Sequence, residues 1–207
     1  MLQNDVKISE HKIINPQSLA AFEDLNPEYP LLVVLVAGKG TRFGKEPKCI
    51  QKVHGKPLAR HSIEAFRRFS SSPVICIVGY RYSDVVEALG DENTYVLSDN
   101  PVGGTAFAAF ESFCIPGLIE KDPYIIITMG DRIIPSSVFR RIAKVHMEGD
   151  READLTFMSA IYEPPKNSGK GRVFRDEKGK VIRIMEERDI VREENPVTMQ
   201  TLLGLTE

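Results

Sequence analysis

The feature that most constrains the fold is a series of short apolar runs, rich in β-branched residues, that alternate with stretches of helical character. Residues 31–36 read LLVVLV, residues 73–79 read PVICIVG, and residues 124–129 read YIIITM. Runs of this kind are typical of strands that are buried on both faces of a parallel sheet. Strand, loop and helix alternate at least three times, which predicts an α/β fold with a Rossmann-like, doubly wound, mostly parallel sheet.

The remaining elements complete this pattern and then change its character. Helices are expected at residues 16–25, 58–69, 83–89 (with Ser83 as cap), 105–113 and 135–144, and a short strand at 94–97. After residue 150 we expect a strand at 153–161 and then a hairpin whose turn is DEKG at 176–179. The sequence therefore predicts an N-terminal extension at 1–30, an α/β core at 31–150 and a small β-rich portion at 151–207.

Composition narrows the classes of partner. The formal net charge of −2 gives no overall field that favours nucleic acid or an anionic membrane surface. The three cysteines, at positions 49, 76 and 114, form no metal-ligand pair, which favours a reducing compartment. No apolar stretch approaches the roughly 20 residues of a membrane span, and the amino terminus lacks a secretory pattern. We expect a cytoplasmic protein; the oligomeric state is left open.

The loop after the first apolar run is the most informative segment. Residues 36–48 read VAGKGTRFGKEPK. Gly38 and Gly40 would let backbone N–H groups approach a phosphate and tolerate positive φ, while Arg42 and Lys48 could grip its oxygens. Neither the Walker pattern nor the dinucleotide pattern fits, and a lone GxG is also compatible with a simple surface turn. A triphosphate whose pyrophosphate departs needs this combination of amides and cations.

A carboxylate follows the third apolar run. Asp131 comes directly after Gly130 at the end of residues 124–129. Both this residue and the glycine loop follow strands, so both should lie at the carboxyl edge of the sheet, where such folds bind ligands. An oxygen ligand in this place suits Mg²⁺. The alternative is that Asp131 caps the helix expected at 135–144.

The order of these motifs resembles the sugar-phosphate nucleotidyltransferases, whose loop reads roughly AAGxGTRM, then PK, then VxGKP. The matching residues are 37–43, 47–48 and 53–58 (VHGKPL). By eye the resemblance is strongest to the pyrophosphorylase domain of bacterial N-acetylglucosamine-1-phosphate uridyltransferases, and it extends from about residue 31 to about residue 189. It implies the nucleotide-diphospho-sugar transferase fold, Mg²⁺ as cofactor, and a nucleoside triphosphate and a sugar 1-phosphate as substrates.

The resemblance also implies roles for individual residues. Nucleotide binding falls to Ala37, Gly38, Gly40, Thr41, Gly104 and Thr105, catalysis to Arg42, Lys48 and Asp131 (the last also the metal ligand), and sugar binding to Gly171 and Glu186. Each assignment has a plain structural alternative: Thr105 as a helix cap, and the 171–186 region as a solvated charged hairpin. The glutamine with which the family reads uracil has no counterpart in residues 97–101, which leaves Ser98, Asp99 or Asn100 for the base.

The expected reaction is an in-line displacement in which a phosphate oxygen of the acceptor attacks the α-phosphorus and pyrophosphate leaves. No protein nucleophile is required, so positioning and charge neutralisation would supply the acceleration. Three alternatives stay open: another acceptor such as phosphocholine, a non-catalytic nucleotide-binding or regulatory module, and a plain structural domain. The later asparagine and metal-binding positions of the family have no counterpart near residues 199–207, so a fragment or a degenerate relative is also compatible with the sequence.

Overall fold

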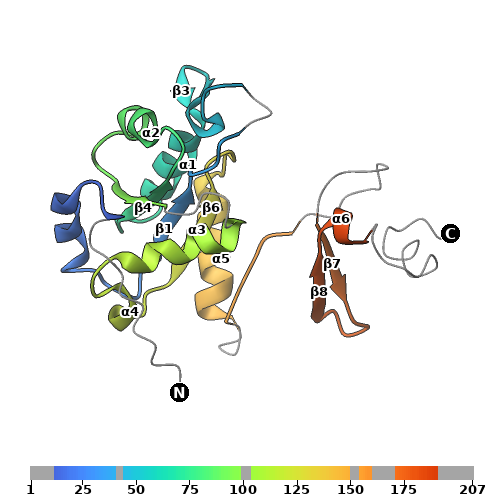
Figure 1. The fold of residues 1–207 in the computed structure, drawn as a ribbon. Coiled ribbons are helices and arrows are strands. Elements are labelled where there is room, and N and C mark those ends of the chain that lie inside the picture. Colours follow the sequence, from blue (N-terminus) through green and yellow to red (C-terminus); the bar gives the residue numbers. More distant parts are fainter. Residues whose placement is uncertain (1–11, 41–43, 99–103, 150–153, 160–170, 191–207) are drawn as a thin grey trace. The chain divides into compact units, whose positions relative to one another are not determined.

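The computed structural model describes residues 12–40, 44–98, 104–149, 154–159 and 171–190 (Figure 1). Its contacts divide the chain into two compact units, Met1–Thr156 and Phe157–Glu207. The first unit holds a four-stranded sheet with helices on both faces, and the second holds a two-stranded hairpin. In the described part of the chain, no helix combines the length and the apolar character that crossing a membrane requires.

The sheet of the first unit is parallel throughout and confirms the predicted fold class. Its strands are β1 (Leu31–Leu35), β4 (Val74–Val78), β5 (Thr94–Leu97) and β6 (Ile125–Met129), in the spatial order β5-β4-β1-β6. The chain moves outward from β1 to β4 and β5 and then returns to the other side of β1. The order therefore reverses between β1 and β6, and doubly wound sheets bind ligands at the carboxyl ends of the strands beside such a switch point.

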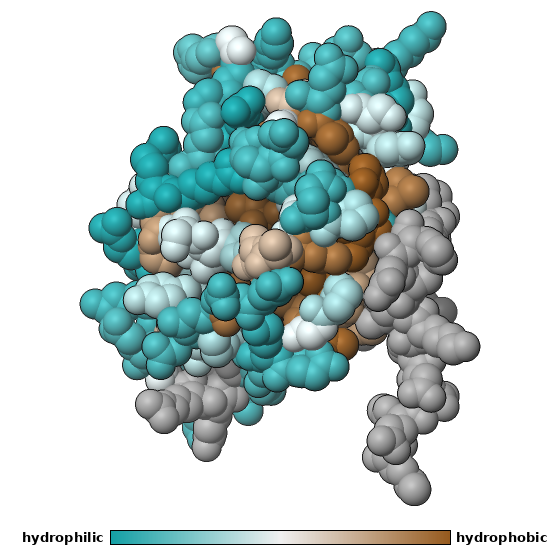
Figure 2. All heavy atoms as spheres, turned by 90° about the vertical axis from the view of Figure 1, so that its left-hand side faces the viewer, coloured by the Kyte–Doolittle hydropathy of each residue, from teal (hydrophilic) through white to brown (hydrophobic). Residues whose placement is uncertain are grey.

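Helices cover both faces of this sheet, as alternate side chains of β1 require. One face carries α1 (Leu58–Arg67), α2 (Tyr82–Leu89) and α5 (Ser136–Glu148); the other carries the 3₁₀ helices η2 (Pro16–Phe22) and η5 (Glu111–Cys114) with α3 (Gly104–Phe110) and α4 (Leu118–Lys121). Leu32 and Val34 point to the first face, and Leu31 and Val33 to the second, all fully buried. Figure 2 shows one side of the molecule, where hydrophilic side chains predominate and hydrophobic ones gather near the centre.

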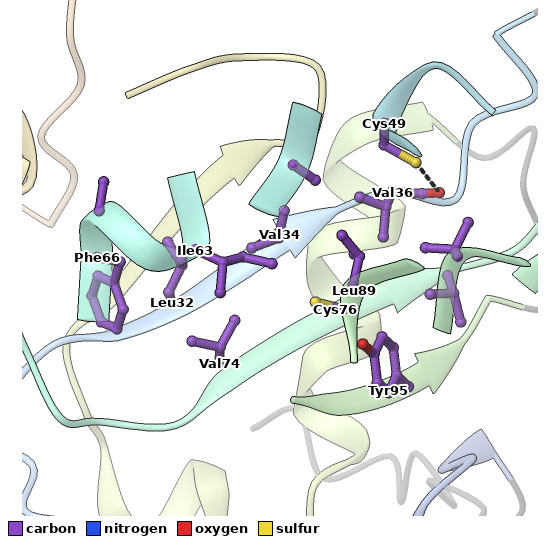
Figure 3. Close-up of a cluster of buried hydrophobic side chains, with 14 of the residues drawn as sticks. Leu32, Val34, Val36, Cys49, Ile63, Phe66, Val74, Cys76, Leu89 and Tyr95 are labelled. Atoms are coloured by element: carbon purple, nitrogen blue, oxygen red, sulfur yellow. Dashed lines mark hydrogen bonds between the residues drawn. The ribbon is translucent and has the colours of Figure 1, made fainter. Parts of the chain in front are cut away.

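The core beneath α1 explains why the apolar runs are continuous. Leu32 and Val34 of β1 pack with Val74 of β4 against Ile63 and Phe66 of the helix (Figure 3). Full burial of side chains of this size contributes about 1.5–3 kcal/mol each, so both faces of the central strands favour apolar residues.

The segment before β1 is part of the first unit. Ile13 forms an antiparallel bridge with Val96 of β5, and Phe22 and Leu25 are buried against the second face. The helix expected at 16–25 is the shorter 3₁₀ helix η2. Within residues 12–30, the predicted extension is therefore packed onto the sheet.

Two local predictions are wrong. Ser83 does not cap α2, because the helix begins one residue earlier and Arg81, in a left-handed conformation, occupies the N-cap position. The strand expected at 153–161 is absent from its described part, residues 154–159. Leu155 there is 74% exposed, so its side chain is not packed against another part of the described structure. Alternating apolar residues form a strand only where such packing is available. In addition, the helix expected at 105–113 is divided into α3 and η5.

Two hairpins complete the described structure. The short β2 (Lys52–Val53) and β3 (Lys56–Pro57) follow the 3₁₀ helix η4 (Lys48–Ile50) in the first unit. The second unit holds β7 (Arg172–Arg175) and β8 (Val181–Met185), followed by α6 (Glu187–Ile190). Asp176 Oδ1 accepts the N–H of Lys178 at 3.0 Å and of Lys180 at 2.8 Å, and Gly179 has φ 81°. The predicted DEKG turn is thus confirmed.

Candidate active site

The two motifs that the sequence places at one edge meet at the switch point. Leu35 of β1 lies opposite Met129 of β6, and the N–H of Gly130 donates to the carbonyl of Leu35 at 2.9 Å. A Cβ on Gly130 would overlap the side chain of Val36, so only glycine lets the two strand ends approach this closely. The glycine loop and Asp131 therefore leave the sheet side by side.

The Lys48 ammonium contacts the Asp131 carboxylate directly. Nζ lies 2.8 Å from Oδ2, and the two side chains are 31% and 29% exposed. The other oxygen, Oδ1, is buried and has no hydrogen-bond partner in the described structure; Arg132 Nε lies 3.6 Å from it. This oxygen has no hydrogen bond from the described residues to satisfy it, and a carboxylate oxygen of this kind is a ligand that Mg²⁺ prefers, but Lys48 and Arg132 would compete with the metal for the carboxylate.

The alternative role of Asp131 as a helix cap is not what the structure shows. Helix α5 begins at Ser136 after Pro135, and no side chain caps it. The Arg132 side chain is 69% exposed and pairs with the Asp131 carboxylate, with Nε 3.6 Å from Oδ1. The Asp131 carboxyl group is thereby kept at the switch point.

The start of the glycine loop packs against its end, where Gly40 lies next to Lys48. Gly40 has φ 56°, and a Cβ there would lie 3.3 Å from the backbone nitrogen of Lys48. Gly38 differs from the expectation: its φ is not positive, and a Cβ there would meet no heavy atom of the described residues within 4 Å. Ala37 is buried at the start of the loop. Thr41 and Arg42 lie outside the described residues, so their roles stay predictions.

The third group of site residues begins α3. Gly104, with φ 85°, is the first residue of this helix, and Thr105 is the second, so Thr105 is not at the N-cap position. Both residues are exposed. Ser98 lies at the carboxyl end of β5, buried, with an Oγ that has no hydrogen-bond partner in the described structure. Asp99 and Asn100, the other candidates for the base, lie outside the described residues.

The two predicted sugar-binding residues lie together in the second unit. They sit where β7 begins and β8 ends, at the open end of the hairpin. A Cβ on Gly171 would lie 3.5 Å from Oε1 of Glu186 and 3.4 Å from the carbonyl of Met185. The Glu186 carboxylate therefore flanks a glycine whose backbone is open to approach, and it is exposed.

Cys49, next to Lys48, lacks the ionised thiol that a nucleophilic role requires. Burial raises the pKa of its thiol to about 11, and the negative charge of Asp131 acts in the same direction. Its Sγ contacts the carbonyl of Val36 at 3.9 Å. Because a thiol, unlike a thiolate, is a weak nucleophile, this side chain serves packing.

Two residues that the sequence did not single out contact the loop. Tyr80 Oη and Arg81 Nη1 both donate to the carbonyl of Lys45, at 3.3 and 3.1 Å. The N–H of Tyr80 donates to the carbonyl of Ala37 at 3.2 Å. Neither residue belongs to a motif; the available signal was their place directly after the buried strand β4.

The comparison with protein families decides the class of the chain. The model of the MobA-like NTP transferase domain matches residues 32–164. The chain belongs to the MobA-like NTP transferase family. The chain is 37% identical over 169 residues to the bifunctional protein GlmU of Caldanaerobacter subterraneus, and 34% identical over 168 residues to that of Bacillus subtilis. In each case the match covers 80% of the chain and 35% of the relative.

A solved structure supports the fold of this NTP transferase. The Rv0371c protein of Mycobacterium tuberculosis superposes with a TM-score of 0.50 at 21% identity, over 60% of this chain and 63% of that one. The resemblance drawn from the loop motifs is thus confirmed at the level of family and fold. Because the chain spans about a third of the length of the curated relatives it matches, the activity and substrates of those whole proteins are a matter for proposal.

Proposed function

We propose that this chain is a pyrophosphorylase that transfers a nucleotidyl group from a nucleoside triphosphate to a sugar 1-phosphate and releases pyrophosphate, with Mg²⁺ as cofactor. The family supports nucleotidyl transfer, and the likeness of the loop to sugar-phosphate nucleotidyltransferases supports the acceptor. The observation that carries the proposal is the Lys48–Asp131 pair at 2.8 Å, at the point where the strand order reverses.

In this reaction an oxygen of the acceptor phosphate forms a bond to the α-phosphorus, and the bond from that phosphorus to the β-bridging oxygen breaks. The bridging oxygen leaves with pyrophosphate, so no proton has to be taken up by a protein base. We expect the amides around Gly38 and Gly40 and the ammonium of Lys48, which lies 2.8 Å from Asp131, to face the leaving group, where negative charge would grow. Fixed dipoles and charges that face developing charge are an effective source of acceleration.

Asp131 is the residue that would hold Mg²⁺, which when bound supplies charge neutralisation at the phosphates. Its buried Oδ1 has no hydrogen-bond partner in the described structure, which fits this role. No group of three or more His, Cys, Asp or Glu side chains in the described ranges could hold a metal. Mg²⁺ characteristically binds through one or two carboxylates together with phosphate oxygens and water, so one carboxylate is sufficient.

The ion pair also fixes the positions of its two charges. Lys48 and Asp131 hold each other at the switch point, so neither charge has to be brought there when the substrate arrives. A triphosphate offers Lys48 anionic oxygens that compete with Asp131. The pair thus preorganises the cation without hiding it, since both side chains stay partly exposed.

The test is a thermal-shift screen of ATP, CTP, GTP and UTP with Mg²⁺, followed by a pyrophosphate-release assay with a panel of sugar 1-phosphates and phosphocholine. A ligand that binds the folded state alone raises the unfolding temperature. Lys48→Ala should abolish the shift, and Asp131→Asn, which keeps the shape of the side chain, should remove its Mg²⁺ dependence. Lys144→Ala is the control, because this 70% exposed lysine pairs with Glu148 on α5.

Each outcome of these assays favours one of the alternative functions. A shift that Lys48→Ala leaves unchanged would remove this residue from the site. Binding without pyrophosphate release across the panel would favour a non-catalytic nucleotide-binding module, and release with phosphocholine alone would replace the sugar. The cytoplasmic location expected from the cysteines stays a prediction.

A further inference from the structure

Arg81 adopts a backbone conformation that its residue type disfavours. Its φ and ψ are 51° and 44°, in the left-handed region. Among the described residues, the other non-glycine positions with positive φ are His54 and Asp122. Left-handed arginine is costly because its Cβ crowds the following carbonyl oxygen. Strain of this kind persists where surrounding contacts impose it, and such sites are frequent at functional regions.

The other two positions have ordinary explanations. His54 precedes Gly55, with φ values of 49° and 77°, in the tight turn between β2 and β3, where two positive values are the rule. Asp122 follows the last residue of α4, a place where left-handed caps are common. Arg81 instead stands before a helix, and its side chain makes no capping hydrogen bond. It is the third residue of a hydrogen-bonded turn, in which the N–H of Tyr82 donates to the carbonyl of Gly79 at 3.1 Å, and a positive φ at this place is ordinary for glycine or asparagine but costly for arginine.

The contacts of Arg81 lead to the glycine loop. Its Nη1 donates to the carbonyl of Lys45 at 3.1 Å, and the guanidinium is steered from the other side by an ion pair with Asp84 of α2. Tyr80 donates its hydroxyl to the same carbonyl at 3.3 Å and its N–H to the carbonyl of Ala37 at 3.2 Å. Three hydrogen bonds from two adjacent residues thus reach Ala37, before the loop, and Lys45, near its end.

Gly79 makes this approach possible. A Cβ at this position would lie 3.0 Å from the carbonyl oxygen and 3.1 Å from the Cβ of Ala37, a separation tighter than side chains tolerate without movement. With glycine there, the end of β4 lies directly against the start of the loop. Residues 79–81 therefore hold Ala37, where the loop begins, and Lys45, three residues before Lys48.

We propose that Tyr80 and Arg81 are positioning residues for nucleotide binding: they fix Ala37 and Lys45, and with them the described residues 38–40 and 44–48, so that Lys48 stays beside Asp131. The proposal rests on the proposed function. Neither residue has to touch the substrate. The strained backbone of Arg81 is retained because it aims the guanidinium at the carbonyl of Lys45, and the benefit is a loop set in place before the triphosphate arrives.

The test separates this role from a merely structural one. Arg81→Gly relieves the backbone strain and removes the guanidinium, whereas Asp122→Gly relieves the same kind of strain away from the loop. Two quantities are measured on both variants: the unfolding temperature without ligand, and the Kd of the best-binding nucleoside triphosphate in the presence of Mg²⁺. Arg81→Gly should unfold at or above the wild-type temperature yet bind about tenfold more weakly, the loss expected for a charge-assisted hydrogen bond. Asp122→Gly should leave Kd unchanged.

Further variants keep the outcome decisive. Tyr80→Phe deletes one oxygen and should weaken binding about threefold without affecting the fold, as loss of a single neutral hydrogen bond implies. Arg81→Lys, which keeps the charge, should recover part of the affinity lost in Arg81→Gly. Wild-type Kd in both Arg81→Gly and Tyr80→Phe would overturn the positioning role while leaving the proposed function intact. If the wild-type chain itself binds no triphosphate, both proposals fall.

Discussion

Replacing Asn15 with alanine tests whether the segment before β1 is part of the cooperative fold. The Asn15 side chain donates from Nδ2 to the carbonyl of Asn93 at 2.7 Å and accepts the N–H of Tyr95 at 3.0 Å through Oδ1. The residue is 9% exposed. Both partners are backbone groups at the edge of β5, so the amide acts as a short extension of the sheet ladder.

The magnitude follows from what alanine leaves behind. The N–H of Tyr95 and the carbonyl of Asn93 would lose these partners inside the fold, and each unsatisfied buried group costs about 1–3 kcal/mol. Allowing for partial access of water, we expect Asn15→Ala to lower the free energy of unfolding by about 2–4 kcal/mol. For a chain of this size, that corresponds to a fall of about 5–15 °C in unfolding temperature.

The assay is urea unfolding followed by circular dichroism, together with a thermal scan of the same samples. The control is Asn26→Ala, because Asn26 is exposed and its Oδ1 accepts the N–H of Glu28 at 2.9 Å in a local turn. This control should change stability by no more than about 0.5 kcal/mol. If Asn15→Ala falls within the same range, the amide bonds are replaced by water at no cost and the argument from burial is refuted.

Three further variants address the loop and the thiols. Gly40→Ala should lower both stability and triphosphate affinity, because φ is 56° there and the new Cβ would lie 3.3 Å from Lys48 N, whereas Gly38→Ala should fold normally in a thermal scan and lose affinity in calorimetry. Burial raises the pKa of Cys49 from 9.0 to about 11, so the folded state holds this proton more tightly, and the free energy of unfolding should fall as pH rises from 9 towards 11. Urea titrations across that range should show a smaller fall in Cys49→Ala. A disulfide-exchange reagent at neutral pH should find no reactive thiol in the folded chain and three in urea, since all three cysteines are buried and none is in a disulfide.

Strands β1 and β4 could be predicted because burial on both faces leaves a direct trace in the sequence. Every residue of β1 and β4 is buried, and the corresponding runs contain apolar residues alone. The run of β6 is nearly as apolar, yet Ile127 and Met129 are 51% and 41% exposed, so burial on both faces was the wrong expectation there. The adjacency of β1 and β6 could not be read in the same way. Strand order depends on contacts between distant segments, so the sequence placed Lys48 and Asp131 at one edge without establishing that they touch.

The errors share a physical cause. The residues near Leu155 alternate like a strand, but a strand also needs a partner, and local pattern carries no information about one. Ser83 has the chemistry of a helix cap, yet the left-handed conformation of Arg81 starts α2 one residue earlier. In both cases tertiary contacts decided between local possibilities that the sequence left close in energy.

The two predicted nucleotide-binding glycines of the loop differ in how the structure explains them. Gly40 is required by the protein itself, because its φ is positive and the backbone of Lys48 lies against it. Gly38 has neither constraint: its φ suits any residue, and the space around a Cβ is open. Within the described structure, nothing intramolecular explains a glycine at position 38. A ligand that approaches the backbone closely would explain it, and phosphate bound by main-chain amides makes such an approach. The anion site at Gly38 therefore stays a prediction, which the affinity of Gly38→Ala tests, whereas the packing around Gly40 accounts for its glycine.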